Sequence, residues 1–180
     1  METSPKIIVI TGAESTGKSV LTEWLASYFQ APFLPEFARE YIKNLNRKYT
    51  YNDVELIARE QISRLEAIKR KNSDAPYFFL DTWLIITKIW FEVVYNYLPV
   101  WFDEQIKNTP VDLFLVCNTD LPWIPDPVRE NGGKQREILQ QKYIETIKDF
   151  NFNYKIVSGK NQERNNNALQ YVLQMTKKPG

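Results

Sequence analysis

A stretch of ten residues, TGAESTGKSV at positions 11–20, constrains the fold of this chain more than any other feature. It follows the apolar run KIIVI and matches the pattern G-x-x-x-x-G-K-[ST] in the context that the pattern requires, after a predicted strand and at the start of a predicted helix. Gly12 and Gly17 let the backbone turn so that its N–H groups point inward, where the helix dipole adds positive potential. The stretch therefore predicts a phosphate-binding loop.

The residues of this loop have distinct expected roles. Lys18 is expected to reach the β- and γ-phosphates of a nucleotide, and Ser19 to offer its hydroxyl to Mg²⁺, which prefers oxygen ligands. The expected cofactors are ATP and Mg²⁺, with the choice between ATP and GTP left open. The predicted nucleotide-binding residues are Gly12, Glu14, Ser15, Thr16, Gly17, Lys18, Ser19 and Val20.

Strand-like and helix-like segments alternate along the chain with short connections, which is typical of an α/β fold with a parallel sheet and helices on both faces. The length of 180 residues suits one domain, residues 1–180, rather than two with separate cores. Pro99 is expected to end a helix, and Asn52 and Glu55 have the spacing of a capping box. The five expected strands cover 6–10, 32–35, 77–80, 111–117 and 154–157, and the expected helices cover 17–29, 36–45, 51–71, 84–97, 134–150 and 162–175.

The composition excludes several classes of function. Lys and Arg total 23 against 22 Asp and Glu, so no global charge favours a nucleic acid or an anionic membrane as partner. Histidine is absent, which removes His-based acid–base chemistry and His metal sites. The single cysteine, Cys117, fits a reducing, cytoplasmic setting, and the N-terminus lacks the pattern of a signal peptide. The longest apolar region, residues 84–101, carries Lys88 and Glu92 and is interpreted as a core helix rather than a membrane span.

A metal-binding carboxylate is predicted at the end of one strand. Asp81 closes the apolar run YFFL, at the carboxyl edge where α/β sheets bind ligands. An acid in that position can hold Mg²⁺ directly or through water. An aspartate that begins a turn gives the same pattern, but the phosphate loop favours the metal role. The predicted metal ligands are Ser19 and Asp81.

The block PEFAREY at 35–41 indicates a second substrate site. Glu36 follows the second expected strand and should face the phosphate loop across a cleft, where a carboxylate can orient or deprotonate an attacking hydroxyl. Arg39 shares a helix face with Glu36 and could clamp an acceptor or a phosphate. An ordinary ion pair between these two residues at the helix start is an equal alternative.

Residues 118–133 are rich in Pro, Asp and Gly, and the segment 118–136 is predicted to form a lid. Arg129 and Arg136 could neutralise the charge that develops in phosphoryl transfer, with a solvated loop as the alternative. Trp123 and Asp126 could stack on and hydrogen-bond a planar base, although core packing explains Trp123 equally well. The predicted catalytic residues are Lys18, Glu36, Arg129 and Arg136, and the predicted acceptor-binding residues are Glu36, Arg39, Tyr41, Asp81, Thr82, Trp123 and Asp126.

In the blocks GAESTGKS, PEFAREY, LDTWLIITKIW and PWIPDPVREN, in that order, the chain resembles the ribosylnicotinamide kinase domain of NadR-type proteins and its stand-alone relatives. The resemblance extends from Lys6 to about Val157. It implies a three-layer P-loop NTPase fold of the nucleoside and nucleotide kinase type with a lid. It also implies transfer of the γ-phosphate of ATP to the 5′-hydroxyl of nicotinamide riboside, a step of NAD biosynthesis that gives nicotinamide mononucleotide.

The chain departs from the family pattern at two points. Family members often have Asp-Thr-Asp where this chain has Asp81, Thr82 and Trp83, so an indole replaces one acid near the acceptor, and Trp83 is expected to line either that pocket or the core. The fused members carry a His-x-Gly-His adenylyltransferase motif, which a chain without histidine lacks. The resemblance thus implies the kinase step alone.

The sequence as a whole favours a small-molecule kinase whose acceptor is nicotinamide riboside or a related nucleoside. Two alternatives stay open: a kinase for another nucleoside or nucleotide, and a regulatory module that binds or hydrolyses ATP and acts through a protein partner. The sequence also leaves the oligomeric state open, and a homo-oligomer is compatible with it.

Overall fold

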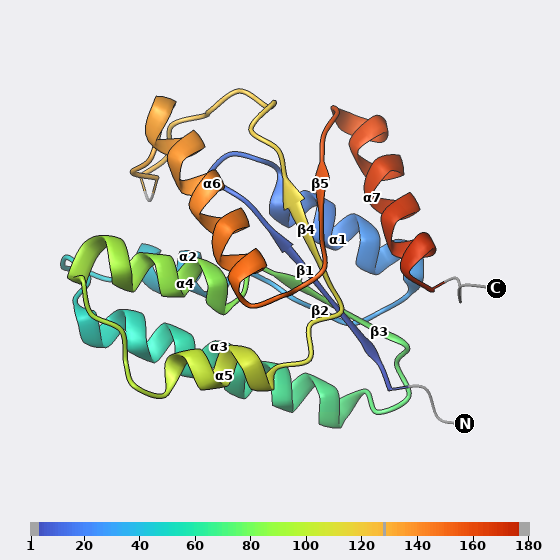
Figure 1. Ribbon diagram of the computed structural model, residues 1–180, viewed down its shortest axis with the longest axis horizontal. Helices are drawn as coiled ribbons and strands as arrows, with labels where there is room; N and C mark the ends of the chain where they lie inside the picture. Colours follow the sequence, from blue (N-terminus) through green and yellow to red (C-terminus); the bar gives the residue numbers. More distant parts are fainter. Residues whose placement is uncertain (1–3, 128, 177–180) are drawn as a thin grey trace.

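The computed structural model describes residues 4–127 and 129–176, which form three layers with the sheet between two sets of helices (Figure 1). The strands of this part of the chain are β1 (Lys6–Thr11), β2 (Phe33–Leu34), β3 (Tyr77–Asp81), β4 (Leu113–Cys117) and β5 (Tyr154–Val157). The helices are α1 (Lys18–Phe29), α2 (Phe37–Lys43), α3 (Tyr51–Lys71), α4 (Leu84–Trp90), the π-helix η1 (Phe91–Tyr95), α5 (Phe102–Asn108), α6 (Gly133–Asp149) and α7 (Asn161–Thr176).

The sheet has the strand order β2-β3-β1-β4-β5, and its neighbouring strands are all parallel. β1 is the central strand, and its residue Ile10 is in register with Asp81 on β3 and Leu115 on β4. Because parallel strands end at the same edge, the loop after β1, Glu36 after β2 and Asp81 on β3 gather at one edge of the sheet. The predicted five-stranded parallel α/β fold is confirmed.

The alternation of side chains along β1 builds two separate apolar layers. Ile8 and Ile10 pack with α1 and α7 on one face of the sheet, and Ile7 and Val9 pack with α3, α4, α5 and α6 on the other. All four side chains are buried, which explains why the run KIIVI is apolar without interruption. Burial of one such side chain contributes about 1.5–3 kcal/mol, so this strand anchors both helical layers.

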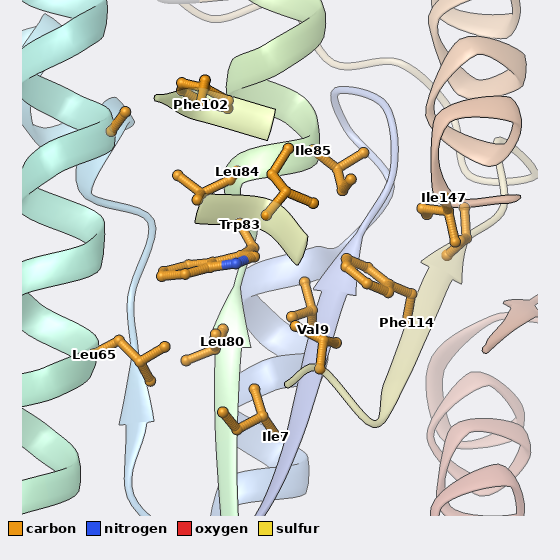
Figure 2. Close-up of a cluster of buried hydrophobic side chains, with 14 of the residues drawn as sticks. Ile7, Val9, Leu65, Leu80, Trp83, Leu84, Ile85, Phe102, Phe114 and Ile147 are labelled. Atoms are coloured by element: carbon orange, nitrogen blue, oxygen red, sulfur yellow. The ribbon is translucent and has the colours of Figure 1, made fainter. Parts of the chain in front are cut away.

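Trp83 belongs to the core. Its side chain is only 3% exposed, and it packs in the apolar layer that contains α3 and α4. Figure 2 shows its indole among Leu65, Leu80 and Leu84. The question that the sequence left open for this residue is therefore answered in favour of core packing.

Two local predictions were wrong, and one short helix was missed. The helix expected over 84–97 changes at Phe91 into the π-helix η1, which ends at Asn96 in a left-handed conformation (φ 49°) rather than at Pro99. A short helix, α5, was not predicted, because seven residues hold too few turns for a periodic pattern to stand out. The capping box of α3 is formed by Thr50 and Asp53, not by the pair two residues later in the chain.

No helix within the described ranges combines the length and the apolar character that crossing a membrane would require. The apolar region at 84–101 contributes instead to α4, to η1 and to the segment after η1. Its interpretation as a core element is consistent with the buried side chains of Leu84, Ile85 and Phe91.

The carboxylate of Asp53 fixes the start of α3 and the loop before it. It accepts hydrogen bonds from Arg47 (2.6 and 2.9 Å), from the hydroxyl of Tyr41 (2.8 Å), and from the backbone N–H (2.7 Å) and hydroxyl (2.8 Å) of Thr50. The guanidinium of Arg47 and these donors hold the pKa of Asp53 far below its usual range, against the effect of burial. The network thus holds residues 44–50 against α3.

Replacement of Asp53 by asparagine is expected to lower the free energy of unfolding at pH 7 by about 2 kcal/mol, because it removes the negative charge and one of the two acceptor oxygens that Arg47 and Thr50 contact. Since the pKa of Asp53 is lowered by folding, its contribution is present above the unfolded value of about 3.9 and is lost as the pH falls below about 4. Denaturant unfolding at pH 7 and from pH 5 to 3 measures both effects. Asp74→Asn, at an exposed position, is the control. If the unfolding free energies of the two variants depended on pH in the same way, Asp53 would not have the stabilising role assigned to it.

Candidate active site

A cavity of about 400 Å³ lies at the carboxyl edge of the sheet, within the range typical of small-molecule sites. The loop between β1 and α1 forms one end, and residues of α2, α3, α4 and η1 form the other. Arg129, Glu130 and Asn131, from the segment before α6, complete the lining of the cavity. Predicted site residues that line the cavity are Gly12, Glu14, Ser15, Thr16, Gly17, Lys18, Ser19, Val20, Glu36, Arg39, Thr82 and Arg129.

The backbone of the phosphate loop explains its two glycines. A Cβ on Gly12 would lie 2.7 Å from the carbonyl oxygen of Cys117 on β4, and the residue has φ 134°. Gly17 has φ 76° and is the N-cap of α1. The hydroxyl of Thr16 donates to the carbonyl of Ala13 at 2.8 Å across the turn. The loop is thus pressed against β4 and opens directly into the N-terminus of α1, the arrangement that favours an anion.

Two polar side chains of this region determine its charge and its position. Nζ of Lys18 donates to the carbonyl oxygen of Ala13 at 2.9 Å, which holds the ammonium group over the loop. Gln140 of α6 accepts from the backbone N–H of Ala13 and donates to the carbonyl of Cys117, both at 2.8 Å. Gln140 was not predicted, and it connects the loop to β4 through buried hydrogen bonds.

Asp81 is buried behind the cavity lining, next to Ser19. Burial raises the pKa of Asp81 to about 6, helped by the negative charge of Glu36 and opposed by a hydrogen bond from Ser19 and the charge of Lys18. One carboxylate oxygen of Asp81 is buried without a hydrogen-bond partner among the described residues. An uncompensated oxygen beside a hydroxyl fits a cation, because oxygen atoms are the ligands that Mg²⁺ prefers.

The described ranges contain no group of three or more Asp, Glu, Cys or His side chains that could hold a metal by themselves. One carboxylate and one hydroxyl match the mode of Mg²⁺ binding in which the remaining ligands are phosphates and waters. Asp81 and Ser19 therefore fit a metal that is brought in together with a nucleotide.

Glu36 and Arg39 are brought to the cavity, but they do not pair with each other. Glu36 is the N-cap of α2 and makes no side-chain hydrogen bond to that helix, so its carboxylate is not used for capping. Arg39 forms its ion pair with Asp126, in the segment between β4 and α6. The alternative of an ordinary ion pair between Glu36 and Arg39 is therefore not what the structure contains.

The phosphate loop holds the segment between β4 and α6. The carboxylate of Glu14 accepts from the backbone N–H of Glu130 (3.2 Å) and of Asn131 (3.0 Å). The hydroxyl of Ser15 accepts from the N–H of Ile124 at 2.9 Å. Residues 124–131 therefore cover the loop in this structure, except that Val128 lies outside the described residues.

Arg136 has a different environment from the one predicted for a lid arginine. It is 6% exposed and donates to the carbonyl oxygens of Leu121 (2.8 Å) and Ser15 (2.9 Å). It does not line the cavity, and burial lowers its pKa. Arg136 thus holds the backbone of the phosphate loop and the segment above it, whereas Arg129 reaches the cavity.

Three predicted acceptor-binding residues also lie outside the cavity lining. The hydroxyl of Tyr41 donates to Asp53 and turns away from the site. Trp123 packs under Gly132, where an added Cβ would lie 3.3 Å from its ring. Asp126 pairs with Arg39 and lies 3.8 Å from Nε of Arg129. Each of these residues orders the walls of the cavity.

Sequence reasoning missed most of the far end of the cavity. Tyr49 and Trp90 line it with their rings 4.9 Å apart, edge to face, and Tyr143 lines it from α6 with a pKa raised by burial. Gln61 of α3 is a further polar residue of this wall. Tyr49 sits in a polar loop and Trp90 in an apolar helix, so no local pattern distinguishes them from surface and core residues. Of the residues predicted to bind the acceptor, Glu36, Arg39 and Thr82 line the cavity.

Comparisons with known proteins agree with this geometry. The chain is 25% identical over 155 residues to the trifunctional NAD biosynthesis/regulator protein NadR of Salmonella typhimurium, which covers 83% of this chain and 37% of that protein. The chain therefore spans about a third of the length of the curated relatives it matches. A crystal structure of NadR in complex with NR superposes with a TM-score of 0.76 at 23% identity, over 96% of this chain and 50% of the other.

A nucleotide kinase has the same fold. Thymidylate kinase from Ehrlichia chaffeensis superposes with a TM-score of 0.67 at 11% identity, over 97% of this chain and 100% of that chain. The similarity to NadR that the sequence blocks indicated is confirmed, as is the kinase-type P-loop fold. A family model described as an AAA domain matches residues 7–164, which is well over half of the sequence, and the chain belongs to that P-loop family.

Proposed function

We propose that this chain transfers the γ-phosphoryl group of Mg·ATP to the 5′-hydroxyl of nicotinamide riboside, giving nicotinamide mononucleotide and ADP. The observation that carries the proposal is a single continuous cavity with a phosphate loop at one end and a carboxylate, Glu36, with an aromatic pair at the other. A hydrolase or a switch has no need for the second end. The structure of NadR in complex with NR, at TM-score 0.76, supports this acceptor in particular.

The acceptor end suits a nucleoside. Tyr49 and Trp90 offer apolar ring surface for a planar base, and rings in contact with such faces contribute about 0.5–1.5 kcal/mol beyond burial. Thr82 offers a hydroxyl for a ribose, and Arg39 lines the same end while paired with Asp126. This arrangement would place the 5′-hydroxyl between Glu36 and the phosphate loop.

In the proposed transfer, the 5′-oxygen forms a bond to the γ-phosphorus while the bond between that phosphorus and the β,γ-bridging oxygen breaks. Glu36 accepts the proton of the hydroxyl, and Lys18 and the loop N–H groups neutralise the leaving ADP. The chemistry that Mg²⁺ supplies when bound is neutralisation of charge on the β- and γ-phosphates, and Ser19 and Asp81 would hold it. Positioning and charge neutralisation provide most of the acceleration.

The proposal treats residues 1–180 as one kinase domain in which 118–136 act as a lid. Glu14 and Ser15 fasten this segment to the loop that binds the phosphates, so closure over the cavity and nucleotide binding are coupled. Arg129 is the lid cation that reaches the cavity.

Replacement of Arg129 by alanine is expected to lower kcat by about tenfold, which corresponds to about 1.4 kcal/mol of transition-state stabilisation, while ATP-analogue binding changes less than about twofold. The reason is that the guanidinium meets charge that develops only during transfer. Single-turnover kinetics and analogue titration measure the two quantities, with the exposed Arg70→Ala as control. If analogue binding and the rate of transfer fell by the same factor, Arg129 would contact the phosphates in the ground state and would have no specific role in the transfer step.

The fold similarity to thymidylate kinase favours one second candidate, a kinase for another nucleoside or nucleotide. A panel decides between them: the chain is incubated with Mg·ATP and nicotinamide riboside, thymidine, deoxyadenosine or thymidine monophosphate, and ADP release is followed. The proposal expects the highest kcat/KM with nicotinamide riboside. Slow ADP release that is the same with every acceptor and without one would instead indicate a regulatory ATP-binding module.

A further inference from the structure

The far wall of the cavity contains a polar pair that connects two helices. Gln61 on α3 is 7% exposed and Thr87 on α4 is 3% exposed, and both line the cavity. The hydroxyl of Thr87 donates to Oε1 of Gln61 at 3.2 Å. Ile86, Ile89 and Leu139 line the same cavity with apolar side chains, and Trp90 and Tyr143 line it with aromatic rings.

Packing of α3 does not call for a glutamine at this position. The buried residues of this helix are Asp53, Val54, Ile57, Ala58, Gln61 and Leu65. Gln61 thus occupies a position of the buried face where the neighbouring positions are apolar. A buried amide costs free energy unless its hydrogen bonds are made, whereas leucine at the same place would not. The amide is therefore better explained by the cavity it lines than by the core.

The chemistry of an amide defines which group it can recognise. A glutamine side chain has two N–H donors and an oxygen with two lone pairs, and Thr87 takes only one of these four positions. A carboxamide offers the complementary donor and acceptor. A carboxylate offers acceptors alone, so it could pair with the N–H groups of the amide but not with the remaining lone pair of its oxygen.

We propose that Gln61, oriented by Thr87, selects acceptors whose base carries a carboxamide. The inference rests on the proposed function, because it takes the far wall as the place of the acceptor base. Gln61 touches the base rather than the reacting atoms, so it is a specificity-determining residue, and Thr87 is a positioning residue that acts through it.

The test compares three pyridine ribosides that differ only at carbon 3 of the ring: the carboxamide, the carboxylate and the unsubstituted compound. Values of kcat/KM are measured with Mg·ATP for the wild-type chain, Gln61→Leu, Thr87→Val and the exposed control Gln141→Leu. The wild-type chain is expected to prefer the carboxamide over the unsubstituted riboside by about tenfold or more. Gln61→Leu should abolish that preference by raising KM for the carboxamide more than KM for the unsubstituted riboside, and Thr87→Val should reduce the preference in part.

Each outcome decides a different point. If the wild-type chain phosphorylates nicotinamide riboside and Gln61→Leu keeps the wild-type preference, the inference is overturned and the proposed function stands. A loss with Gln61→Leu that is the same for the carboxamide and the unsubstituted riboside assigns the residue to packing, which thermal unfolding of the variant checks independently. If the wild-type chain phosphorylates none of the three ribosides, the proposed acceptor is wrong and the inference falls with it.

Discussion

Replacement of Lys18 by alanine is expected to lower the rate of phosphoryl transfer by about 10³-fold or more, the largest effect of any single change proposed for this chain. The ammonium group of Lys18 is held over the phosphate loop by the carbonyl of Ala13, at 2.9 Å, and no other lysine lines the cavity among the described residues. Its position over the loop would therefore not be taken by another lysine when β- and γ-phosphates bind.

Single-turnover transfer and binding of a non-hydrolysable ATP analogue measure the effect of Lys18→Ala. Lys71→Ala, at the exposed end of α3, removes the same charge outside the cavity and serves as the control. Both variants should unfold within about 1 kcal/mol of the wild-type chain, since the hydrogen bond lost with Lys18 is a single one. A Lys18→Ala variant with near-normal turnover would reject the assignment of the loop.

The second large effect is expected for Glu36→Gln, which keeps the shape of the side chain and removes its charge. Transfer should slow by about 10²-fold, the effect typical of a lost general base, while binding of the ATP analogue stays within about twofold. The side chain lines the cavity, is not consumed by capping α2, and acts electrostatically on Asp81. It is thus free to accept a proton from an acceptor hydroxyl.

Glu40→Gln is a matched control for this change, because Glu40 lies one turn further along α2, is exposed and faces Arg64 at 4.0 Å. Rates are measured under single-turnover conditions with saturating acceptor, so that weakened acceptor binding is not mistaken for slower transfer. Similar rates for Glu36→Gln and Glu40→Gln would leave Glu36 without a role in proton transfer.

The fold was predictable because its main elements are long or strongly patterned. The continuous apolar run of β1, the loop after it and the apolar periodicity of α3 each fix one element without reference to the rest of the chain. A short element escaped this reasoning: α5 has seven residues and was not predicted, whereas the two residues of β2 lie within the strand expected over 32–35. The π-helix η1 escaped as well, because its hydrogen-bond pattern depends on packing against α3 and not on local propensity.

The candidate site was predictable at the phosphate end and less so at the acceptor end. The loop glycines and Lys18 are recognisable from spacing alone, since the backbone conformation that binds phosphate demands them. Arg39 and Arg136 were identified as cations near the site, but their partners, Asp126 and the carbonyl of Ser15, come from distant parts of the chain. Whether an arginine remains available to a substrate therefore depends on partners that lie far away in the sequence, and the sequence pattern around the arginine does not identify them.

The π-helix η1 has a consequence for how acceptor preference can change during evolution. It supplies Val93 and Val94 to the cavity immediately after Trp90, and it closes at Asn96. A π turn contains one residue more than an α turn, so the loss of a single codon there would restore a regular helix while the residues beyond it keep nearly the same orientation. The side chains that line the cavity at 93 and 94 would change while α4 and the sheet keep their packing. The wall of the proposed acceptor site can thus be remodelled by length variation, independently of the point substitutions that act on the phosphate loop.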